Sequence, residues 1–220
     1  MSTKAAFWND LVTPQDDFTG NGAQGRYLYR FTQNTKFFLG GKYTDRHFDG
    51  PTENYKVYDG LAGYEHFFSP YFSLSLAGGY FVLKRVTSDD RDGYTYDVSL
   101  KKRFRRGSVS INSSSGWDEI YLATEDRGLV RYWSGNLAAE YQIMEQVNIY
   151  AEGSYRLNKD LTARRWETLR GLGGIRVTFL RRFSFSMDYI YAENDDDIDT
   201  DDYRNNRVVA TLTISRPFRL

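Results

Sequence analysis

The sequence predicts an all-β protein, folded as a transmembrane antiparallel up-and-down β-barrel of twelve strands. Three observations predict this fold class. Apolar and polar side chains alternate with a period of two residues, which is the period of a strand. The alternating segments are long, at about 10 to 15 residues each. The connections between them are short and long in turn.

The alternation is clearest in the middle of the chain. In residues 94–104, Tyr96, Val98 and Leu100 fall on one face, and the residues between them are polar or charged. The same pattern recurs in residues 72–82, 147–157, 183–191 and 208–218. Because no segment shows a comparable stripe at the helical period, we expect essentially no helix.

The connections define the strands and their direction. Short turns are expected near residues 33–35, 69–70, 105–107, 144–146 and 181–182. Long polar loops are expected at about 13–22, 46–54, 87–93, 118–128, 159–165 and 194–202. With a weak first strand at about 4–12, this division gives twelve strands, with short periplasmic turns at one end and long extracellular loops at the other.

Strand length separates the membrane barrel from a soluble β-sandwich or a lipocalin-like barrel, which would show the same alternation. Soluble strands are usually about 5 or 6 residues long, whereas a tilted strand needs about 9 to 11 residues to cross a bilayer. Aromatic residues also gather toward the strand ends, as an interfacial girdle requires, in Phe67, Phe68, Tyr71, Phe72, Tyr94, Trp117, Trp166, Phe179, Phe183, Tyr191 and Phe218. These features favour the membrane barrel.

Composition excludes several other classes of protein. The chain has 18 Tyr, 15 Phe and 4 Trp, which argues against disorder. Its 29 basic and 29 acidic residues cancel, so we expect no nucleic-acid partner. With no cysteine, disulfides, thiolate nucleophiles and cysteine metal sites are absent. The mean hydropathy of −0.61 fits strands of which only alternate residues face lipid.

The pattern is uniform from about residue 22 onward, and no linker interrupts it. We therefore expect one domain over residues 1–220, in which residues 1–21 form the weak first strand and its loop. Residues 1–7 contain no apolar core segment and no cleavage site. For an exported protein, we therefore expect the signal peptide to have been removed from this sequence.

The last strand keeps its alternation almost to the C-terminus. Phe218 and Leu220 hold the apolar phase, while Arg216 breaks it. Outer-membrane barrels typically end in such a strand with a terminal aromatic residue, which their assembly machinery reads. We therefore expect the barrel assembly machinery to be a partner during biogenesis.

Three stretches carry a resemblance to a known family. They are Gly116-Trp117-Asp118-Glu119 followed by Leu129-Val130-Arg131-Tyr132-Trp133-Ser134, then Asp199-Thr200-Asp201-Asp202-Tyr203-Arg204-Asn205-Asn206-Arg207-Val208, and the hairpin form of Leu137-Ala138-Ala139-Glu140-Tyr141-Gln142 into Val147-Asn148-Ile149-Tyr150-Ala151. From about residue 22 the chain resembles the outer-membrane β-barrel porins (beta-barrel porin 2-like) often encoded with exopolysaccharide or surface-polymer export genes in Gram-negative bacteria. The resemblance implies a bacterial outer-membrane location. It also implies contact with outer-membrane lipid and lipopolysaccharide, and partners among surface-export proteins.

Charged and polar residues on the less apolar face are expected to line the lumen, since an Arg or Lys facing mid-bilayer lipid would cost about 2–4 kcal/mol. They are Asp97, Lys101, Arg103, Glu140, Gln142, Glu152, Arg156, Arg170, Arg176 and Asp188. Opposed Arg and carboxylate groups leave two interpretations open: a narrow polar path, or a plug of paired charges without transport.

An acidic loop is expected at the extracellular end. It contains Asp195, Asp196, Asp197, Asp199, Asp201 and Asp202. A hydrated, self-repelling loop is the first interpretation, and loose binding of divalent cations is the second. The calcium-loop pattern of EF-hands is not matched, so we predict no metal site and no cofactor. Basic residues such as Lys101, Arg103 and Arg106 mark the opposite rim.

No catalytic residues are assigned, and the chain is expected not to be an enzyme. Its two histidines, His47 and His66, should lie at opposite ends of the barrel. His47 is a candidate base for a barrel hydrolase, but no nucleophile motif accompanies it.

The leading functional hypothesis is a narrow passive, porin-like channel connected with surface-polymer export. The alternative is a structural or docking barrel with a closed lumen, whose outer loops bind polymer, lipopolysaccharide or a partner protein. A barrel hydrolase is the third.

Overall fold

The computed structural model describes residues 2–7, 18–49, 53–122, 125–160, 164–179, 183–197 and 202–214. It contains only strands: β1 (Ser2–Phe7), β2 (Phe18–Arg30), β3 (Thr35–Phe48), β4 (Tyr55–Ser69), β5 (Phe72–Arg85), β6 (Arg91–Phe104), β7 (Gly107–Leu122), β8 (Glu125–Met144), β9 (Val147–Asp160), β10 (Arg165–Phe179), β11 (Phe183–Asp196) and β12 (Tyr203–Ile214). Among these residues no helix is present that could cross a membrane.

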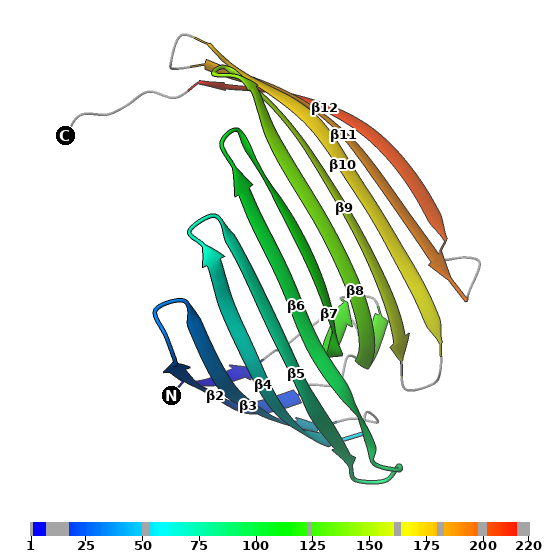
Figure 1. Cartoon of the computed structure of the whole chain (residues 1–220). Coiled ribbons are helices and arrows are strands. Elements are labelled where there is room, and N and C mark those ends of the chain that lie inside the picture. Colours follow the sequence, from blue (N-terminus) through cyan, green and yellow to red (C-terminus); the bar gives the residue numbers. More distant parts are fainter. Residues whose placement is uncertain are drawn as a thin grey trace, which may run out of the picture.

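The strands form one antiparallel sheet in which each strand pairs with the next along the chain. The sheet is strongly curled, and β2 and β12 lie near its opposite edges (Figure 1). This up-and-down order confirms the all-β, antiparallel part of the sequence prediction.

The prediction of twelve membrane-length strands in a closed barrel is wrong in two respects. Eleven strands, β2 to β12, have 12 or more residues, whereas β1 has six. Within the described residues, no ladder joins β1 to β12, so the sheet is open. β1 pairs with β2 only from Thr19 to Gln24, so the rest of the β2 edge is uncovered as well. The predicted first strand at 4–12 lies partly outside the described residues.

The connections fall at two ends, which we call the turn end and the loop end. Short turns at the turn end join β2 to β3, β4 to β5, β6 to β7 and β8 to β9, as predicted. At the loop end several predicted loops are shorter than expected, because the strands run further. The largest difference is at residues 118–128, where β7 continues to Leu122 and β8 begins at Glu125.

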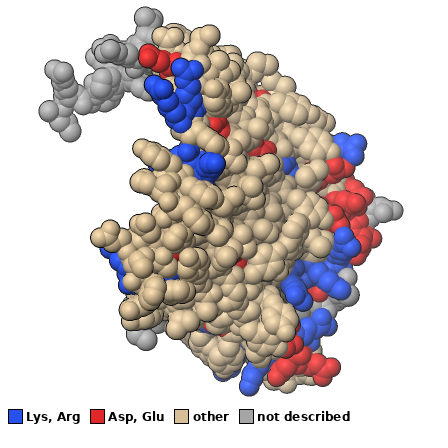
Figure 2. Space-filling view, viewed as in Figure 1, with Lys and Arg blue, Asp and Glu red and all other residues tan. Residues whose placement is uncertain are grey.

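The register divides the side chains between two faces. On the outer face, large apolar side chains are exposed along the length of the strands, as in Leu39, Tyr80, Ile111, Leu137 and Leu212. Leu28, which is also exposed, is an exception on the opposite face. Figure 2 shows a broad uncharged surface between two ends where charged side chains gather. This is the polarity that a lipid-facing wall requires.

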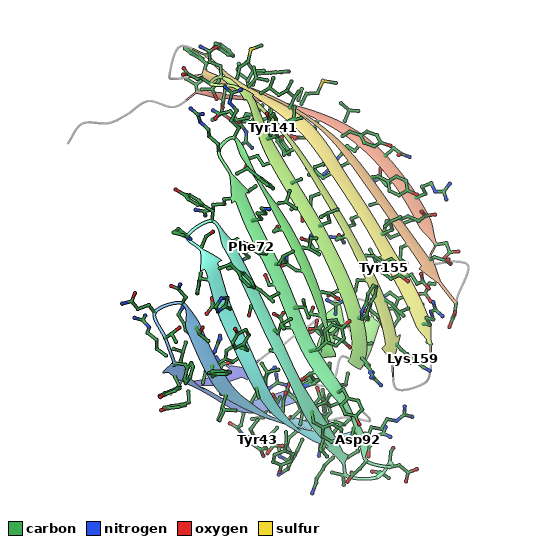
Figure 3. The ribbon with its side chains drawn as sticks, in the orientation of Figure 1. Tyr43, Phe72, Asp92, Tyr141, Tyr155 and Lys159 are labelled. Carbon is green, nitrogen blue, oxygen red and sulfur yellow. The ribbon has the colours of Figure 1, made fainter. Side chains whose placement is uncertain are left out.

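Tyrosines mark the outer face toward the loop end. Tyr43 and Tyr58 pack with ring centroids 5.2 Å apart, and Tyr80 and Tyr94 with centroids 5.4 Å apart. In Figure 3, Tyr43 and Tyr155 lie toward the loop end, where Asp92 is also found. The hydroxyl of Tyr43 donates to Asp45 at 3.0 Å, so this ring joins apolar surface to charge, as girdle residues do.

Two neighbouring positions on β8 test which face meets lipid. Leu137 is 52% exposed on the outer face, whereas Asn136 donates to Glu152 on the other face. We expect Leu137→Arg to lower the free energy of unfolding in lipid vesicles by about 2–4 kcal/mol, because the charge would enter hydrocarbon. Asn136→Arg should lower it much less. Denaturant titration of both variants measures the difference, and equal losses would contradict this assignment of faces.

Candidate functional site: the inner face and an inward hairpin

All ten residues predicted to line a lumen share one face of the sheet, which we call the inner face. Residues that lie opposite each other in neighbouring strands have their side chains on the same face of the sheet. Asp97 lies opposite Ser114, and Glu140 lies opposite Tyr150. Farther along, Tyr150 lies opposite Gly174, which lies opposite Asp188. Lys101, Arg103, Gln142, Glu152, Arg156, Arg170 and Arg176 fall in the same phase.

At its loop end the β7–β8 hairpin separates from β6 and lies over the inner face, while β8 stays paired with β9 as far as Val130. The β6–β7 ladder reaches Ser115, whereas the β7–β8 ladder continues to Leu122. Trp117 follows the end of the β6–β7 ladder and reaches back toward β4, where its indole N–H donates to Asp59 at 3.3 Å. Such a contact, across β5 and β6, is possible only on the concave side of the curled sheet.

Trp117 and its surroundings form the main apolar cluster of the described structure. Trp117 is 8% exposed, and Leu129 on β8 is 3% exposed. The cluster also contains Phe48, Tyr55, Val57, Phe81 and Leu83. The core therefore lies inside the curl of the sheet, between the hairpin and strands β3 to β5.

A second anchor ties the hairpin to β9. Arg156 Nη2 donates to Asp118 Oδ2 at 2.9 Å, and the guanidinium lies 4.5 Å from the ring centroid of Tyr132. Its Nε donates to Asn158, which is 2% exposed. The hairpin is thus held on both sides, by β4 and by β9.

This arrangement corrects two sequence predictions. Residues 118–128 were expected to be a free outer loop, and Trp117 was expected in the interfacial girdle. The structure instead buries Trp117 beside Asp59. A signal was available, since Leu129 and Val130 are adjacent apolar residues at the edge of an otherwise polar loop.

A cavity of about 640 Å³ lies beside the hairpin on the inner face. Its lining includes Gln24, Arg26, Lys42, Asp59, Thr95, Asp97, Ser114, Trp117 and Tyr132. Of the ten predicted residues, only Asp97 lines this cavity. Arg103, Glu140 and Gln142 line another cavity, of about 310 Å³, at the turn end.

The expected pairing of Arg with carboxylate across the lumen is rare. Among the ten residues, in the described part of the chain, only Arg156 forms an ion pair, and its partner is Asp118 of the hairpin. The other contacts made by this set in the described residues are with neutral groups. Glu152 accepts from Asn136, and Asp188 accepts from the hydroxyl of Tyr150. Arg176 lies over the Tyr150 ring at 5.3 Å.

Part of the predicted acidic loop is described, and there one of its carboxylates, that of Asp196, forms an ion pair. Asp195 and Asp196 end β11, and Arg164 binds both carboxylate oxygens of Asp196 at 2.8 and 2.9 Å. The Asp197 carboxylate accepts from the Arg165 amide, and that of Asp202 accepts from the Asp196 amide. Asp199 and Asp201 lie outside the described residues. In the part of the chain that is described, no three potential metal ligands cluster.

The two histidines lie at opposite ends of the sheet, as predicted. His47, near the loop end of β3, has its Nε2 3.3 Å from Asp45. His66, near the turn end of β4, shares a 2.9 Å hydrogen bond with Thr35. Within the described residues, no serine lies in hydrogen-bonding contact with either imidazole. The arrangement therefore offers no assembled nucleophile and base.

Two loop-end connections are joined by Glu53. Its carboxylate accepts from the Ser88 hydroxyl at 2.7 Å, from the Ser88 amide at 2.7 Å and from the Thr87 amide. Arg85 lies 3.8 Å away. These donors, led by the Ser88 hydroxyl, lower the pKa of Glu53 below its ordinary value of 4.5.

Comparisons with known proteins place the fold. The chain is similar to the outer membrane channel DcaP of Acinetobacter baumannii, with a TM-score of 0.63 and 13% identity over 90% of this chain. It is also similar to a loop L8 deletion mutant of OmpT, an outer membrane protein of Vibrio cholerae, with a TM-score of 0.48 and 12% identity over 90% of this chain. In both cases the chain spans 62% of the length of the other protein.

No family model matches the chain, and no curated protein does. The specific beta-barrel porin 2 resemblance therefore has no support from these comparisons. The likeness to DcaP shows the fold, which is the antiparallel up-and-down sheet of an outer-membrane β-barrel.

The Glu53 contacts predict a pH dependence at the loop end. Because the folded-state pKa is lowered, the stabilisation is fully present above pH 4.5 and is lost as the pH falls through the folded-state value below it. Amide hydrogen exchange at Thr87 and Ser88, compared at each pH with Glu53→Gln, measures the effect. Wild type should be better protected at pH 7, and the two proteins should converge once the pH has fallen below the folded-state pKa of Glu53. A difference that stays constant with pH would contradict the prediction.

Proposed function

We propose that the chain forms the wall of a narrow passive channel in the outer membrane of a Gram-negative bacterium. The observation that carries this proposal is the division of the two faces. All ten polar and charged candidates share the inner face, while large apolar side chains cover the outer one. Solutes would diffuse through water along the inner face, past its Arg, Lys and carboxylate groups.

Conduction through lipid also requires that the free edges of the sheet be covered. An unpaired row of backbone amides and carbonyls is not tolerated in hydrocarbon. The edge of β12 and the uncovered part of β2 must therefore be paired in the membrane, either with each other or with other strands. We propose single-channel behaviour only for protein in which these edges are paired.

The proposed link with surface-polymer export rests on the sequence resemblance alone. Lipopolysaccharide, the barrel assembly machinery and surface-export proteins are proposed partners on the same basis. The apolar outer face and its tyrosines support contact with lipid in general.

A docking barrel with a closed lumen is the second candidate, and the hairpin favours it. Leu129 and Val130 are buried inside the curl, where an open channel would hold water. The contacts between loop-end connections, such as Arg164 with Asp196, would give a partner an ordered surface. Solute flux separates the two candidates, because only the channel requires it.

Planar-bilayer recording tests the channel and its lining together. Folded wild-type protein should give discrete conductance steps. Arg170→Gln combined with Arg176→Gln should shift the reversal potential in a salt gradient toward cation preference, because both cations lie on the inner face. Lys102→Met, on the outer face of β6, should leave ion selectivity unchanged. Absence of steps from folded protein would reject the channel.

The hairpin should limit conductance. Leu129→Ala removes a side chain that is 3% exposed, and should lower the free energy of unfolding by about 2–5 kcal/mol. Trp117→Ala removes the contact with Asp59, so both variants should loosen the hairpin and increase single-channel conductance. Leu137→Ala, on the lipid-facing side of the same strand, is the matched control and should leave conductance unchanged. Unchanged conductance in both hairpin variants would show that the hairpin does not border the path.

A further inference from the structure

We infer that the cavity of about 640 Å³ beside the hairpin binds a small hydroxylated carboxylate of the sugar-acid class. The inference deepens the proposed function, since it names a solute class for the same inner face. The cavity has the size of ordinary small-molecule sites, which are about 300–1,000 Å³. Six strands contribute to its lining: β2, β3, β4, β6, β7 and β8.

Two cations on neighbouring strands supply an anion-binding wall. The Arg26 guanidinium lies 3.8 Å from the Phe38 ring centroid, and Lys42 Nζ lies 4.3 Å from that of Trp117. In the described residues, neither cation has a carboxylate within ion-pair distance. Both lie on the inner face, since Gln24 pairs with Lys42 and Arg26 pairs with Gly40. They are therefore diagonal neighbours, close enough to act on one anionic group.

Glycine leaves room in front of these cations. Gly40 faces Arg26 across the ladder, and a Cβ built there would meet no atom nearer than 3.8 Å. Asp59 opposite Lys42 offsets part of the positive charge, but its Oδ2 already accepts the indole N–H of Trp117. A carboxylate on the solute can thus meet Arg26 and Lys42 without displacing a protein side chain.

The far wall of the cavity is built for hydroxyl groups. Thr95 is 8% exposed, and its Oγ1 has no hydrogen-bond partner although it is buried. A buried hydroxyl without a partner costs free energy. Rotation of the Thr95 side chain about χ1 would turn this hydroxyl toward the cavity, where a hydroxyl on the solute would pair with it. Asp97 lines the same wall, and its carboxylate can only accept hydrogen bonds, which solute hydroxyls donate.

These walls discriminate between classes of solute. A neutral sugar would satisfy Thr95 and Asp97 but would leave the positive charge of Arg26 and Lys42 unmatched. A dicarboxylate without hydroxyls would bring a second negative charge close to Asp97 and Asp59. A solute with one carboxylate and several hydroxyls matches both walls.

Isothermal titration of folded protein in detergent tests the inference, with D-glucuronate, glucose and succinate as probes. D-Glucuronate should bind saturably to wild type and more tightly than the other two. Arg26→Gln and Lys42→Met should each weaken its binding by about tenfold or more. Lys102→Met removes a cation that lies over the Phe72 and Phe104 rings on the outer face, and should leave binding unchanged.

Three results would overturn the inference: no saturable binding of D-glucuronate to wild type, equal binding of succinate or glucose, or full affinity in both cation variants. Thr95→Val provides an independent variant if a cation variant fails to fold, and it should weaken D-glucuronate binding as well. Because titration needs no conduction, binding without channel activity would reject the proposed channel and leave the site standing. Conductance without binding would reject the proposed site and leave the proposed channel standing.

Discussion

The structure depends on one constraint: a backbone that crosses lipid must pair its own amides and carbonyls. An antiparallel ladder between consecutive strands meets this requirement locally, and it forces side chains alternately to the two faces. The exposed rings of Tyr27 and Tyr80 and the inward charges of Arg170 and Asp188 are two consequences of that single geometry. The low mean hydropathy follows, because lipid contacts only every second residue.

Features carried by the period of two could be predicted from the sequence. A register shift of one residue would place the apolar side chains of a whole strand on the wrong face. The register is therefore strongly specified where one face is apolar. For this reason all ten predicted lumen residues fall on the inner face. Most turns are also local, as at Pro70 between β4 and β5 or Gly107 at the start of β7. Such features need information from only a few neighbouring residues.

Features that depend on distant residues could not be predicted. Trp117 meets Asp59, which is 58 positions away, and no local pattern distinguishes that contact from a place in the girdle. The pairing of Asp196 with Arg164 likewise joins two loops that the sequence treats separately. The open edge is a third case, because closure depends on pairing between the first and last strands of the sheet, which are far apart in the sequence.

Apolar contacts contribute more than polar contacts to holding the β7–β8 hairpin against the inner face. Two of its polar anchors in the described residues are partly exposed: Asp118 with Arg156, and Trp117 with Asp59. Burying an aliphatic side chain contributes about 1.5–3 kcal/mol, and Leu129 and Val130 are both buried. An exposed ion pair contributes about 1 kcal/mol at most, so the apolar contacts dominate. The seated hairpin is therefore the ground state, and any solute path runs beside it, along the wall that Arg26, Lys42 and Asp97 line.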